Sequence, residues 1–524
     1  MTRRIAILSS AEPLTAWQAA CVDALAAAGG EVGARVVCAD APSPEPLSSA
    51  GASGRAADGP PAALRTIPAR IVSIADVSGA IAGGIDCAIA FDEALARAVR
   101  LALPLGTWTF CVGARDARGA PPGVGELLRA DGAIEATLAR VDCEPNTALK
   151  RGWFPTVAHS YGATLDNARF GAAPWPARVL AELERGCAPA QTAFDRAPDA
   201  RRSFGAGRRA GFAAMLAARA AGAKLHDLFL HEHWNIGVVE RPIGSFLARA
   251  SSDDVRWLAP PPTGTFIADP FGRAADGALQ LLCEGFDHRD ARGYLASGPI
   301  EGDRARLEPF LRLPVHLSYP FVVEDGGEIY CIPESSEAGE IAIYRARAFP
   351  RQWERVATLV EGFGGCDASV VFHDGAWWMF ATAREAPNHE LHVWHAQRLL
   401  GPWRPHARNP VKTDIRSARP AGTPFHAGGE LYRPAQDCAG GYGKRVAINR
   451  VRALTTTAFE ETPVTFVEPD ARGPWPAGLH TLSAAGDVTL IDGKRFAFAP
   501  GEFARRAMTY ARKSVRRVSA AIKG

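Results

Sequence analysis

A repeat of about 50 residues between Phe266 and Asn449 constrains this chain more than any other feature. Four segments each hold a short apolar strand, a tight turn (AADG, EDGG, HDG or HAGG) and a second strand rich in aromatic or branched residues. Aligning the turns places Asp269, Ser318, Asp367 and Pro420 in register, at intervals of 49, 49 and 53 residues. A period near 50 with a hairpin in each unit is typical of β-propeller blades.

Two distant segments predict a fifth blade. Residues 478–498 (GLHTLSAAGDVTLIDGKRFAF) contain two strands around a turn, and HEHWNIGVV at 231–239 can complete their sheet. Pairing the start of the repeat region with its end closes the ring and protects its strand edges. We therefore expect an all-β five-bladed propeller over residues 228–500.

The first 190 residues have a different pattern. An apolar strand at 4–9, a helix at 14–29 and a second strand at 31–38 predict an α/β domain with a doubly wound, Rossmann-type sheet. No GxGxxG motif follows the first strand, so the dinucleotide fingerprint is missing. Further strands and helices are expected at 86–91, 93–102, 105–113, 134–142, 152–157 and 176–185, and a loop at 41–64.

Two connecting segments remain. Residues 191–227 are expected to form a linker with a helix, and residues 501–524 a basic amphipathic helix. The terminal segment 502–524 has seven Lys and Arg residues against one Glu. It could lie on an anionic membrane surface. Docking on the protein body or a frayed tail stays open.

Bulk composition narrows the function classes. A length of 524 residues predicts two or three domains, and a net charge of +3 gives no argument for nucleic acid. Ten single cysteines without a CxxC pair favour reduced thiols in a cytosolic protein. The N-terminus lacks the apolar stretch of a signal peptide, and no run of about 18 apolar residues predicts a membrane span. A cytoplasmic location is expected, with membrane association as an alternative.

The repeat register points to a carboxylate-lined pit. In a propeller the start of each inner strand faces the central channel, so Asp269 and Asp367 should share one axis. The second strands of the first two units end at Glu284 and Glu334, and the corresponding place of the fourth unit holds Gln436 and Asp437. Converging carboxylates are what glycosyl transfer needs, since crowding separates their pKa values into acid and base roles. Capping of turns is the structural alternative for each aspartate.

Other side chains could contact a substrate there. Tyr319 offers a flat face for a sugar ring. Arg419 and Arg433 could hold a carboxylate or a phosphate of a donor, although salt bridges to Asp437 would account for them equally well. No cofactor is expected, apart from a possible nucleotide-sugar donor. His231 and His233 share a strand face, but without a third ligand no metal site is predicted.

Long motifs in this region carry a family resemblance. The segments YPFVVEDGGEIYCIPESSEAGEIAIYRARAFPRQW, CDASVVFHDGAWWMFAT, LLGPW, SARPAG and LYRPAQDCAGGYG resemble the N-terminal domain of glucosamine inositolphosphorylceramide transferases over about residues 228–465. More distantly, the region is similar to the five-bladed glycoside hydrolases, among them arabinanases, invertases and levansucrases. That similarity implies a base or nucleophile at Asp269, a transition-state carboxylate at Asp367 and an acid, for which Glu334 is the candidate.

The N-terminal part resembles the fold of the formyltransferases that act on methionyl-tRNA and glycinamide ribonucleotide. The resemblance rests on the segments at 107–128 and 136–147. Where that family has an Asn and a His, this chain has Phe110, Cys111 and Val112, and Asn146 lies near the place of the Asp. These residues cannot shuttle a proton as His and Asp do. The resemblance therefore implies the fold and disfavours formyl or acyl transfer.

These observations lead to one main hypothesis. We expect a carbohydrate-active protein that performs glycosyl transfer or hydrolysis in surface glycan or glycolipid biosynthesis, with a carbohydrate or glycolipid substrate. Asp269 would be the base or nucleophile, Glu334 the acid and Asp367 the stabilising group. The alternative is a non-catalytic protein that binds a glycan or a nucleotide sugar. Formyl or acyl transfer is a third, disfavoured hypothesis.

Overall fold

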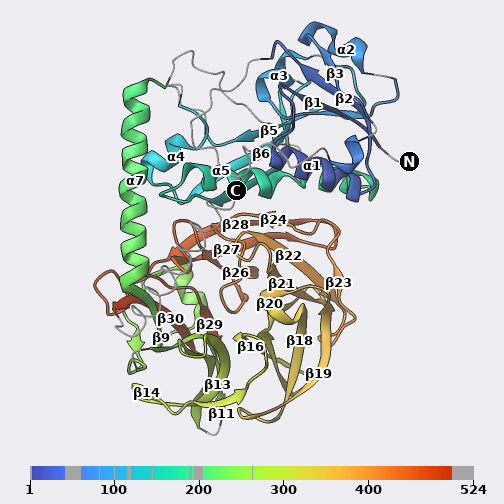
Figure 1. The fold of residues 1–524 in the computed structure, drawn as a ribbon. Coiled ribbons are helices and arrows are strands. Elements are labelled where there is room, and N and C mark those ends of the chain that lie inside the picture. Colours follow the sequence, from blue (N-terminus) through green and yellow to red (C-terminus); the bar gives the residue numbers. More distant parts are fainter. Residues whose placement is uncertain are drawn as a thin grey trace. The chain divides into compact units, whose positions relative to one another are not determined.

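The computed structural model divides the chain into two compact units, Met1–Ala220 and Ala221–Gly524 (Figure 1). It describes residues 3–41, 61–65, 67–81, 83–99, 101–114, 120–143, 145–187, 192–193, 204–262, 264–275 and 277–498. Most of the predicted loop at 41–64 and the whole basic segment 501–524 lie outside the described residues.

The first unit is built on an eight-stranded mixed sheet of order β3-β2-β1-β4-β5-β6-β7-β8. Its first five strands are parallel: β1 (Arg4–Ser9), β2 (Glu31–Cys38), β3 (Arg70–Val72), β4 (Cys87–Ala90) and β5 (Gly106–Val112). Three antiparallel strands extend it: β6 (Ala133–Arg140), β7 (Thr147–Pro155) and β8 (Thr192–Ala193). The predicted strand–helix–strand start is present as β1, a helix and β2, but the sheet is mixed, and a doubly wound, Rossmann-type sheet is not shown. The formyltransferase resemblance stays a prediction.

Both faces of this sheet are apolar. On β1, Ile5 and Ile7 join one buried cluster while Ala6 and Leu8 join the other, as the period-2 alternation of a strand requires. The helices of the unit are α1 (Ala16–Ala27), α2 (Val77–Ala80), α3 (Glu93–Ala98), α4 (Val124–Arg129), α5 (Tyr161–Ala172) and α6 (Trp175–Glu184).

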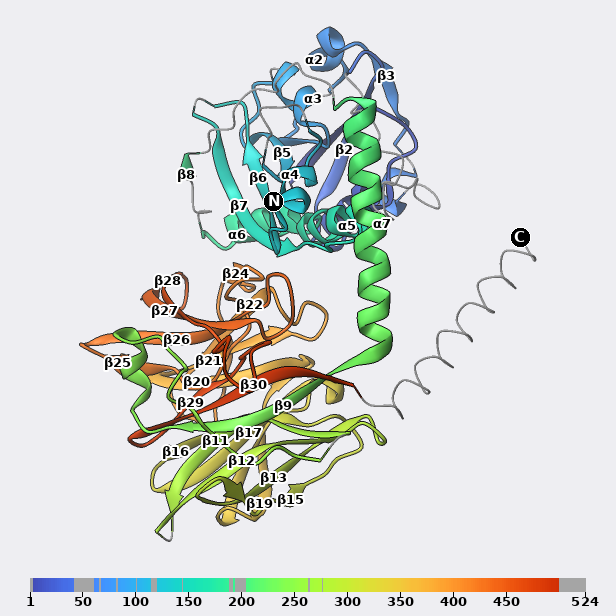
Figure 2. The same cartoon turned by 90° about the vertical axis from the view of Figure 1, so that its left-hand side faces the viewer.

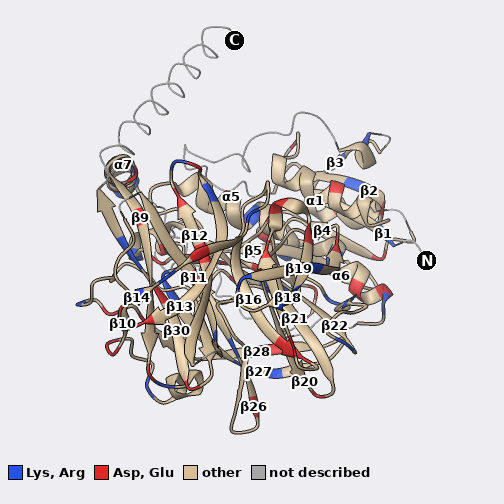
Figure 3. Ribbon diagram, turned by 90° about the horizontal axis from the view of Figure 1, so that it is seen from below, with Lys and Arg blue, Asp and Glu red and all other residues tan. Residues whose placement is uncertain are grey.

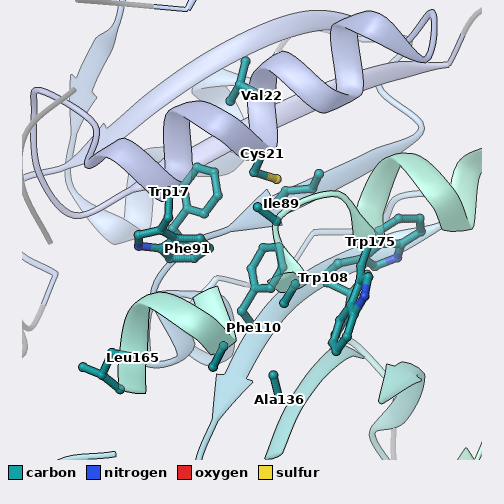
Figure 4. Close-up of a cluster of buried hydrophobic side chains, with 14 of the residues drawn as sticks. Trp17, Cys21, Val22, Ile89, Phe91, Trp108, Phe110, Ala136, Leu165 and Trp175 are labelled. Carbon is teal, nitrogen blue, oxygen red and sulfur yellow. The ribbon is translucent and has the colours of Figure 1, made fainter. Parts of the chain in front are cut away.

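Aromatic side chains fill the larger cluster (Figure 4). Trp17 of α1 packs edge-on against Phe91 and Phe110, with ring centroids 5.3 and 5.1 Å apart. Cys111 is buried as well, and burial is typical of a packing role for a thiol. Phe110 and Cys111 are therefore side chains of the hydrophobic core.

A single helix, α7 (Ala206–Phe229), crosses the boundary between the units and runs into β9 (Leu230–Val239). Phe212 is its one fully buried residue. The helical stretch expected within 191–227 is thus present, and it continues two residues beyond that segment. No helix in the described part of the chain is both long and apolar enough to cross a membrane.

The second unit is a five-bladed propeller, as predicted. Five separate antiparallel sheets follow one another, and the first four consist of consecutive strands. The first blade contains β11 (Thr265–Ala275), β12 (Ala278–Asp287), β13 (Arg292–Glu301), β14 (Arg304–Ala305) and β15 (Glu308–Leu311), and the second contains β16 (Ser318–Asp325), β17 (Glu328–Glu334), β18 (Glu340–Ala348) and β19 (Gln352–Glu361). The third contains β20 (Gly365–His373), β21 (Ala376–Ala383), β22 (Glu390–Ala396), β23 (Arg404–Pro405) and β24 (Lys412–Thr413), and the fourth contains β25 (Phe425–Ala427), β26 (Glu430–Asp437), β27 (Arg445–Leu454) and β28 (Phe459–Val467).

Both ends of the propeller sequence build the fifth blade. Its strands β29 (Leu482–Ala485) and β30 (Val488–Phe498) are joined by β9 and β10 (Arg256–Trp257), in the order β10-β9-β30-β29. The β9–β30 ladder runs without interruption from the Thr489–Val239 pair to the Phe498–Leu230 pair. The predicted closure of the ring is confirmed, and it leaves the inner strand β29 in place beside the first blade.

The inner strands of the first three blades share a local irregularity. Each ladder is interrupted at one step, and the residue there has a left-handed backbone: Asp269 (φ 53°), Tyr319 (φ 46°) and Asp367 (φ 52°). Positive φ is unusual for residues other than glycine and is found at functional sites. The aligned turns had placed Ser318 in this register, which is wrong by one residue, because Tyr319 occupies the position equivalent to the two aspartates.

Close packing in the fifth blade predicts that a larger residue at Gly493 would destabilise the protein. A Cβ atom added at Gly493 would overlap the ring of Trp257 and lie 2.7 Å from Cβ of Trp475. We expect Gly493→Ala to lower the free energy of unfolding by about 1–3 kcal/mol through overpacking. Gly441→Ala is the control, since its Cβ would meet nothing within 4 Å. Chemical denaturation of both variants tests this, and equal stability of the two would contradict it.

Candidate active site

Two buried aspartates of the propeller centre lie on either side of one histidine. Asp492, on β30, lies with its Oδ2 2.7 Å from Nδ1 of His480, and Nε2 of His480 lies 3.4 Å from Oδ1 of Asp269. Thr481 Oγ1 donates a hydrogen bond of 2.9 Å to the same Oδ1. The indole of Trp234 covers the imidazole, with ring centroids 4.1 Å apart. First and last blades therefore meet in an Asp269–His480–Asp492 cluster.

Burial and mutual charge set the protonation of this cluster. Burial raises the pKa of Asp269 to about 7; the neighbouring His480 opposes that shift, and the charge of Asp367 adds to it. Burial by itself would lower the pKa of His480, but Asp492 and Asp269 outweigh it and raise that pKa to about 9. Burial thus favours the neutral form of Asp269, while the two carboxylates favour the charged form of His480.

The same three residues are close enough to ligate a metal. Their ligand atoms all lie within 4.8 Å of one another, which among the described residues is the one such group of His, Cys, Asp and Glu. Two hard carboxylates and an imidazole suit several divalent ions. A metal would have to displace the proton that the two carboxylates hold on His480.

A second carboxylate cluster surrounds Asp367. Arg419 Nε donates to Asp367 Oδ2 at 2.5 Å and its Nη2 donates to Oδ1 at 3.3 Å, and Gln436 Nε2 donates to Oδ2 at 2.8 Å. The paired contact fixes the carboxylate plane. Burial raises the pKa of Asp367 to about 7, with Arg419 opposing the shift and the charge of Glu334 adding to it.

Glu334 belongs to this second cluster. Its Oε2 accepts the backbone N–H of Asp367 at 3.1 Å and Arg419 Nη2 at 3.4 Å, and its Oε1 accepts Ser336 Oγ at 3.0 Å. Every one of these partners is a donor. Such contacts suit a carboxylate that holds Asp367 and Arg419 in position, and they are less suited to a group that presents a proton to a substrate.

Tyr319 contacts the first cluster from within the core. Its backbone N–H donates to Asp269 Oδ2 at 3.2 Å, and its hydroxyl lies 2.8 Å from Ser369 Oγ and receives the backbone N–H of Gly422. The side chain is fully buried and packs on Phe271. A face for sugar stacking, as expected from the sequence, is therefore covered by protein.

Of the remaining predicted residues, Glu284 lies near the carboxylate clusters, whereas Arg433 and Asp437 lie elsewhere in the propeller. Glu284 lies beside the centre and contacts His316, whose Nε2 is 3.3 Å from its Oε1. Arg433 is fully buried and binds Glu461 through two hydrogen bonds, while Asp437 pairs with Arg445 at 2.7 Å. The structure thus does not bring Arg433 and Asp437 to the carboxylate clusters, and neither pairs with the other.

The sequence pattern missed several central residues. His480 and Thr481 precede the inner strand of the fifth blade, where the rule applied to Asp269 would have found them. Asp492 gave no such signal, because it lies inside β30. The two histidines of the HxH motif, His231 and His233, do not belong to these clusters. They are buried on β9 with ring centroids 6.4 Å apart, and burial lowers the pKa of His233 to about 4.

The protein is thus a five-bladed propeller with two buried carboxylate clusters at its centre. All five blades contribute residues to these clusters. Residues 259–476 match the family model of the N-terminal domain of glucosamine inositolphosphorylceramide transferase 1. The transferase of this name from Oryza sativa subsp. japonica is 34% identical over 262 residues, covering 46% of this chain and 35% of the relative. The Arabidopsis thaliana protein is 32% identical over 248 residues, covering 44% and 32%. The resemblance predicted for the propeller is confirmed.

The chain spans about a third of the length of these relatives. The similarity to solved structures is weaker. An exo-β-1,3-galactanase from Phanerochaete chrysosporium has a TM-score of 0.31 at 15% identity, covering 38% of this chain and 49% of that one. A thermostable family-43 glycoside hydrolase has a TM-score of 0.31 at 14% identity, covering 40% and 77%. Likeness this distant says nothing about the reaction.

The histidine between two carboxylates predicts a pH-dependent stability. The pKa of His480 is raised from 6.5 to about 9 on folding, so its contribution is complete below pH 6.5 and is lost as pH rises through 9. We expect the propeller to lose stability on the order of 3 kcal/mol or less over this interval. His480→Gln should flatten that part of the stability–pH curve.

Chemical denaturation between pH 6 and pH 10 measures the effect. His373→Gln is the matched control, since His373 lies at the end of β20 and contacts His426 rather than the carboxylates. An unchanged slope in His480→Gln would show that the imidazolium is not held by Asp269 and Asp492.

Proposed function

We propose that this protein is a carbohydrate-active enzyme that transfers or hydrolyses a glycosyl group in glycan or glycolipid biosynthesis. The observation that carries the proposal is the pair of buried aspartates, Asp269 and Asp367, both with a pKa of about 7. Groups that exchange a proton near neutral pH, close to one another and within a propeller centre, are what glycosyl chemistry requires. The match to a transferase domain supports the same class of substrate.

Asp269 is proposed as the reacting group. As a nucleophile its carboxylate would attack the anomeric carbon, and as a base it would remove the proton of the acceptor hydroxyl or of water. His480 supports either role, because an adjacent imidazolium stabilises the carboxylate form. The contact with Asp492 keeps that imidazolium charged and oriented.

Asp367 is proposed as the group that stabilises the cationic sugar. Arg419 and Gln436 hold its carboxylate in one orientation, which is the preorganisation that electrostatic stabilisation needs. Glu334 remains the candidate acid from the sequence. Its three donor contacts also suit a supporting role that holds Asp367 and Arg419 in position.

The relatives suggest where to look for a substrate. Their name describes transfer of glucosamine to inositolphosphorylceramide. We therefore propose an activated amino sugar or hexose as donor and an inositol-containing phospholipid or a related glycolipid as acceptor. Binding of the same compounds without turnover is the alternative function.

Asp269→Asn tests the proposal. Incubation with nucleotide sugars and inositol phospholipids, and with nitrophenyl glycosides for hydrolysis, should give turnover in the unaltered protein and a loss of at least about 10³-fold in the variant. Binding of the donor, followed by calorimetry, should persist. The control is Asp374→Asn, at an exposed turn with its own positive φ, which should keep full activity.

The outcomes separate the two functions. Turnover that survives in Asp269→Asn would exclude Asp269 as the reacting group. Binding with no turnover in the unaltered protein, across both donor classes, would favour the binding protein over the enzyme.

A further inference from the structure

A tyrosine outside the predicted site residues lies beside both carboxylate clusters. Tyr442 belongs to the connection between β26 and β27. Its ring packs edge-on against that of His480, with centroids 5.3 Å apart, and the guanidinium of Arg419 lies 5.3 Å from the centre of the same ring. His480 belongs to the first cluster and Arg419 to the second. Tyr442 therefore contacts one member of each cluster.

The main chain around this tyrosine is fixed against the fifth blade. The carbonyl of Tyr442 accepts the ammonium group of the buried Lys494. The next residue, Gly443, has a φ of 59°, and a Cβ atom there would lie 2.7 Å from the ring of Trp234. The carbonyl of Gly443 accepts the N–H of Leu479 at 2.9 Å. Because these contacts hold Tyr442 in place, a ligand that binds it does not have to order it first.

The hydroxyl of Tyr442 is available to a ligand. The residue is partly exposed, and its hydroxyl makes no hydrogen bond with the residues that the structure describes. Burial of the packed ring raises the pKa of Tyr442 well above its ordinary value; Arg419 opposes that shift, and the charges of Asp269 and Asp367 add to it. The hydroxyl therefore keeps its proton and can donate it in a hydrogen bond.

Arg419 also contacts a second partly exposed residue, Asn388, in the connection between β21 and β22. The Oδ1 atom of Asn388 accepts Nη1 of Arg419 at 3.2 Å. Because a guanidinium can only donate, the amide oxygen faces Arg419 and the Nδ2 group is left to other partners. Within the described ranges of the chain, Nδ2 has no hydrogen-bond acceptor. Figure 2 shows β21 and β22 beside β26 and β27, as Figure 1 does, so the two connections come from neighbouring blades.

The charges beside these two donors disfavour an anionic ligand. The clusters together hold more carboxylates than cationic side chains: Asp269, Asp492, Asp367 and Glu334 against His480 and Arg419. Figure 3 shows both signs of charge interspersed over the ribbon, and the net charge of the chain is only +3, so no long-range field compensates for this excess. Hydroxyl groups suit the place better, because each can accept from a phenol or an amide and donate to a carboxylate.

We propose that Tyr442 and Asn388 bind the sugar ring of the substrate, each by donating a hydrogen bond to one of its oxygens. The inference rests on the proposed function for the identity of the ligand. Arg419 contacts both residues and also holds the carboxylate of Asp367, so the two donors have a fixed position relative to that group. They thereby select a hydroxyl-bearing ring and place it at the carboxylate clusters.

Tyr442→Phe tests the proposal, because it removes the hydroxyl and keeps the ring that packs on His480 and Arg419. Calorimetry with UDP-glucose, UDP-N-acetylglucosamine and methyl glucoside should show binding of at least one probe by the unaltered protein. The variant should bind that probe about three- to tenfold more weakly, the loss expected of one uncharged hydrogen bond. Tyr432→Phe is the matched control with full affinity, since Tyr432 is a partly exposed tyrosine of β26 that stacks on Phe425.

Asn388→Asp tests the second donor. The substitution keeps an oxygen for Arg419 and replaces the Nδ2 group by an oxygen that cannot donate. Affinity for the same probe should fall by at least about threefold, and the double variant with Tyr442→Phe should lose about the product of the two factors. Where a probe is turned over, the loss should appear in KM with little change in kcat. Circular dichroism and unfolding curves verify that each variant folds.

The inference and the proposed function can fail separately. Full affinity in Tyr442→Phe, with turnover and KM unchanged, would overturn the inference and leave the enzyme in place, because the tyrosine would then serve only in packing. Binding that Tyr442→Phe weakens, without turnover by the unaltered protein, would support the inference and exclude the enzyme. Failure of the unaltered protein to bind any of the probes would overturn the inference as well.

Discussion

The carboxylate of Asp492 connects the closure of the propeller to its centre. It is fully buried, and its two oxygens accept the backbone N–H groups of His480, Thr481 and Asp269 at 2.9, 3.0 and 3.2 Å, in addition to the ion pair with the His480 ring. A buried charge is tolerated only when it is satisfied in this way. Asp492 lies on β30, the strand that pairs with β9 to close the ring. The position of Asp269 therefore depends on the pairing of β30, the last strand among the described residues, with β9, the first strand of the propeller.

Both aspartates of the site are held in a similar way. Asp269 and Asp367 come from inner strands at a step where the ladder is interrupted and the backbone is left-handed. Such a backbone costs about 1–3 kcal/mol per residue and persists where surrounding contacts hold it. Here Asp492 holds the backbone N–H of Asp269, and Glu334 holds that of Asp367. Asp269 and Asp367 are thus each fixed through the main chain by a second carboxylate from another strand.

Much of this architecture was predictable from local pattern. The hairpin turns gave the blades, and the polar residue at the start of an inner strand gave Asp269 and Asp367. The register failed by one residue at Tyr319, although the interrupted ladder step is the same in all three blades. The prediction that Arg433 faces a substrate at the centre was also misleading. Arg433 binds Glu461 on β28, whereas Gln436, three residues later, donates to Asp367. His480 escaped notice because a longer spacing breaks the repeat before the fifth blade, and Asp492 because it lies inside β30.

In the N-terminal unit, the positions of the strands were predictable from the sequence, but their directions were not. Its strands follow the apolar runs closely, with β1 and β2 at the predicted residues. What the pattern could not foresee is the antiparallel half of the sheet, because an apolar run does not record the direction of its neighbour. Phe110 and Cys111 are core residues there.

The pairing of Leu230 with Phe498 has a consequence for how this propeller can be combined with other domains. Both ends of this propeller lie side by side on the fifth blade, so the chain enters and exits the ring at one place. Segments can be exchanged on either side of it without altering the order of its blades. The same geometry makes the turns between other blades natural places for new chain ends, since joining the original ends would require only a short link.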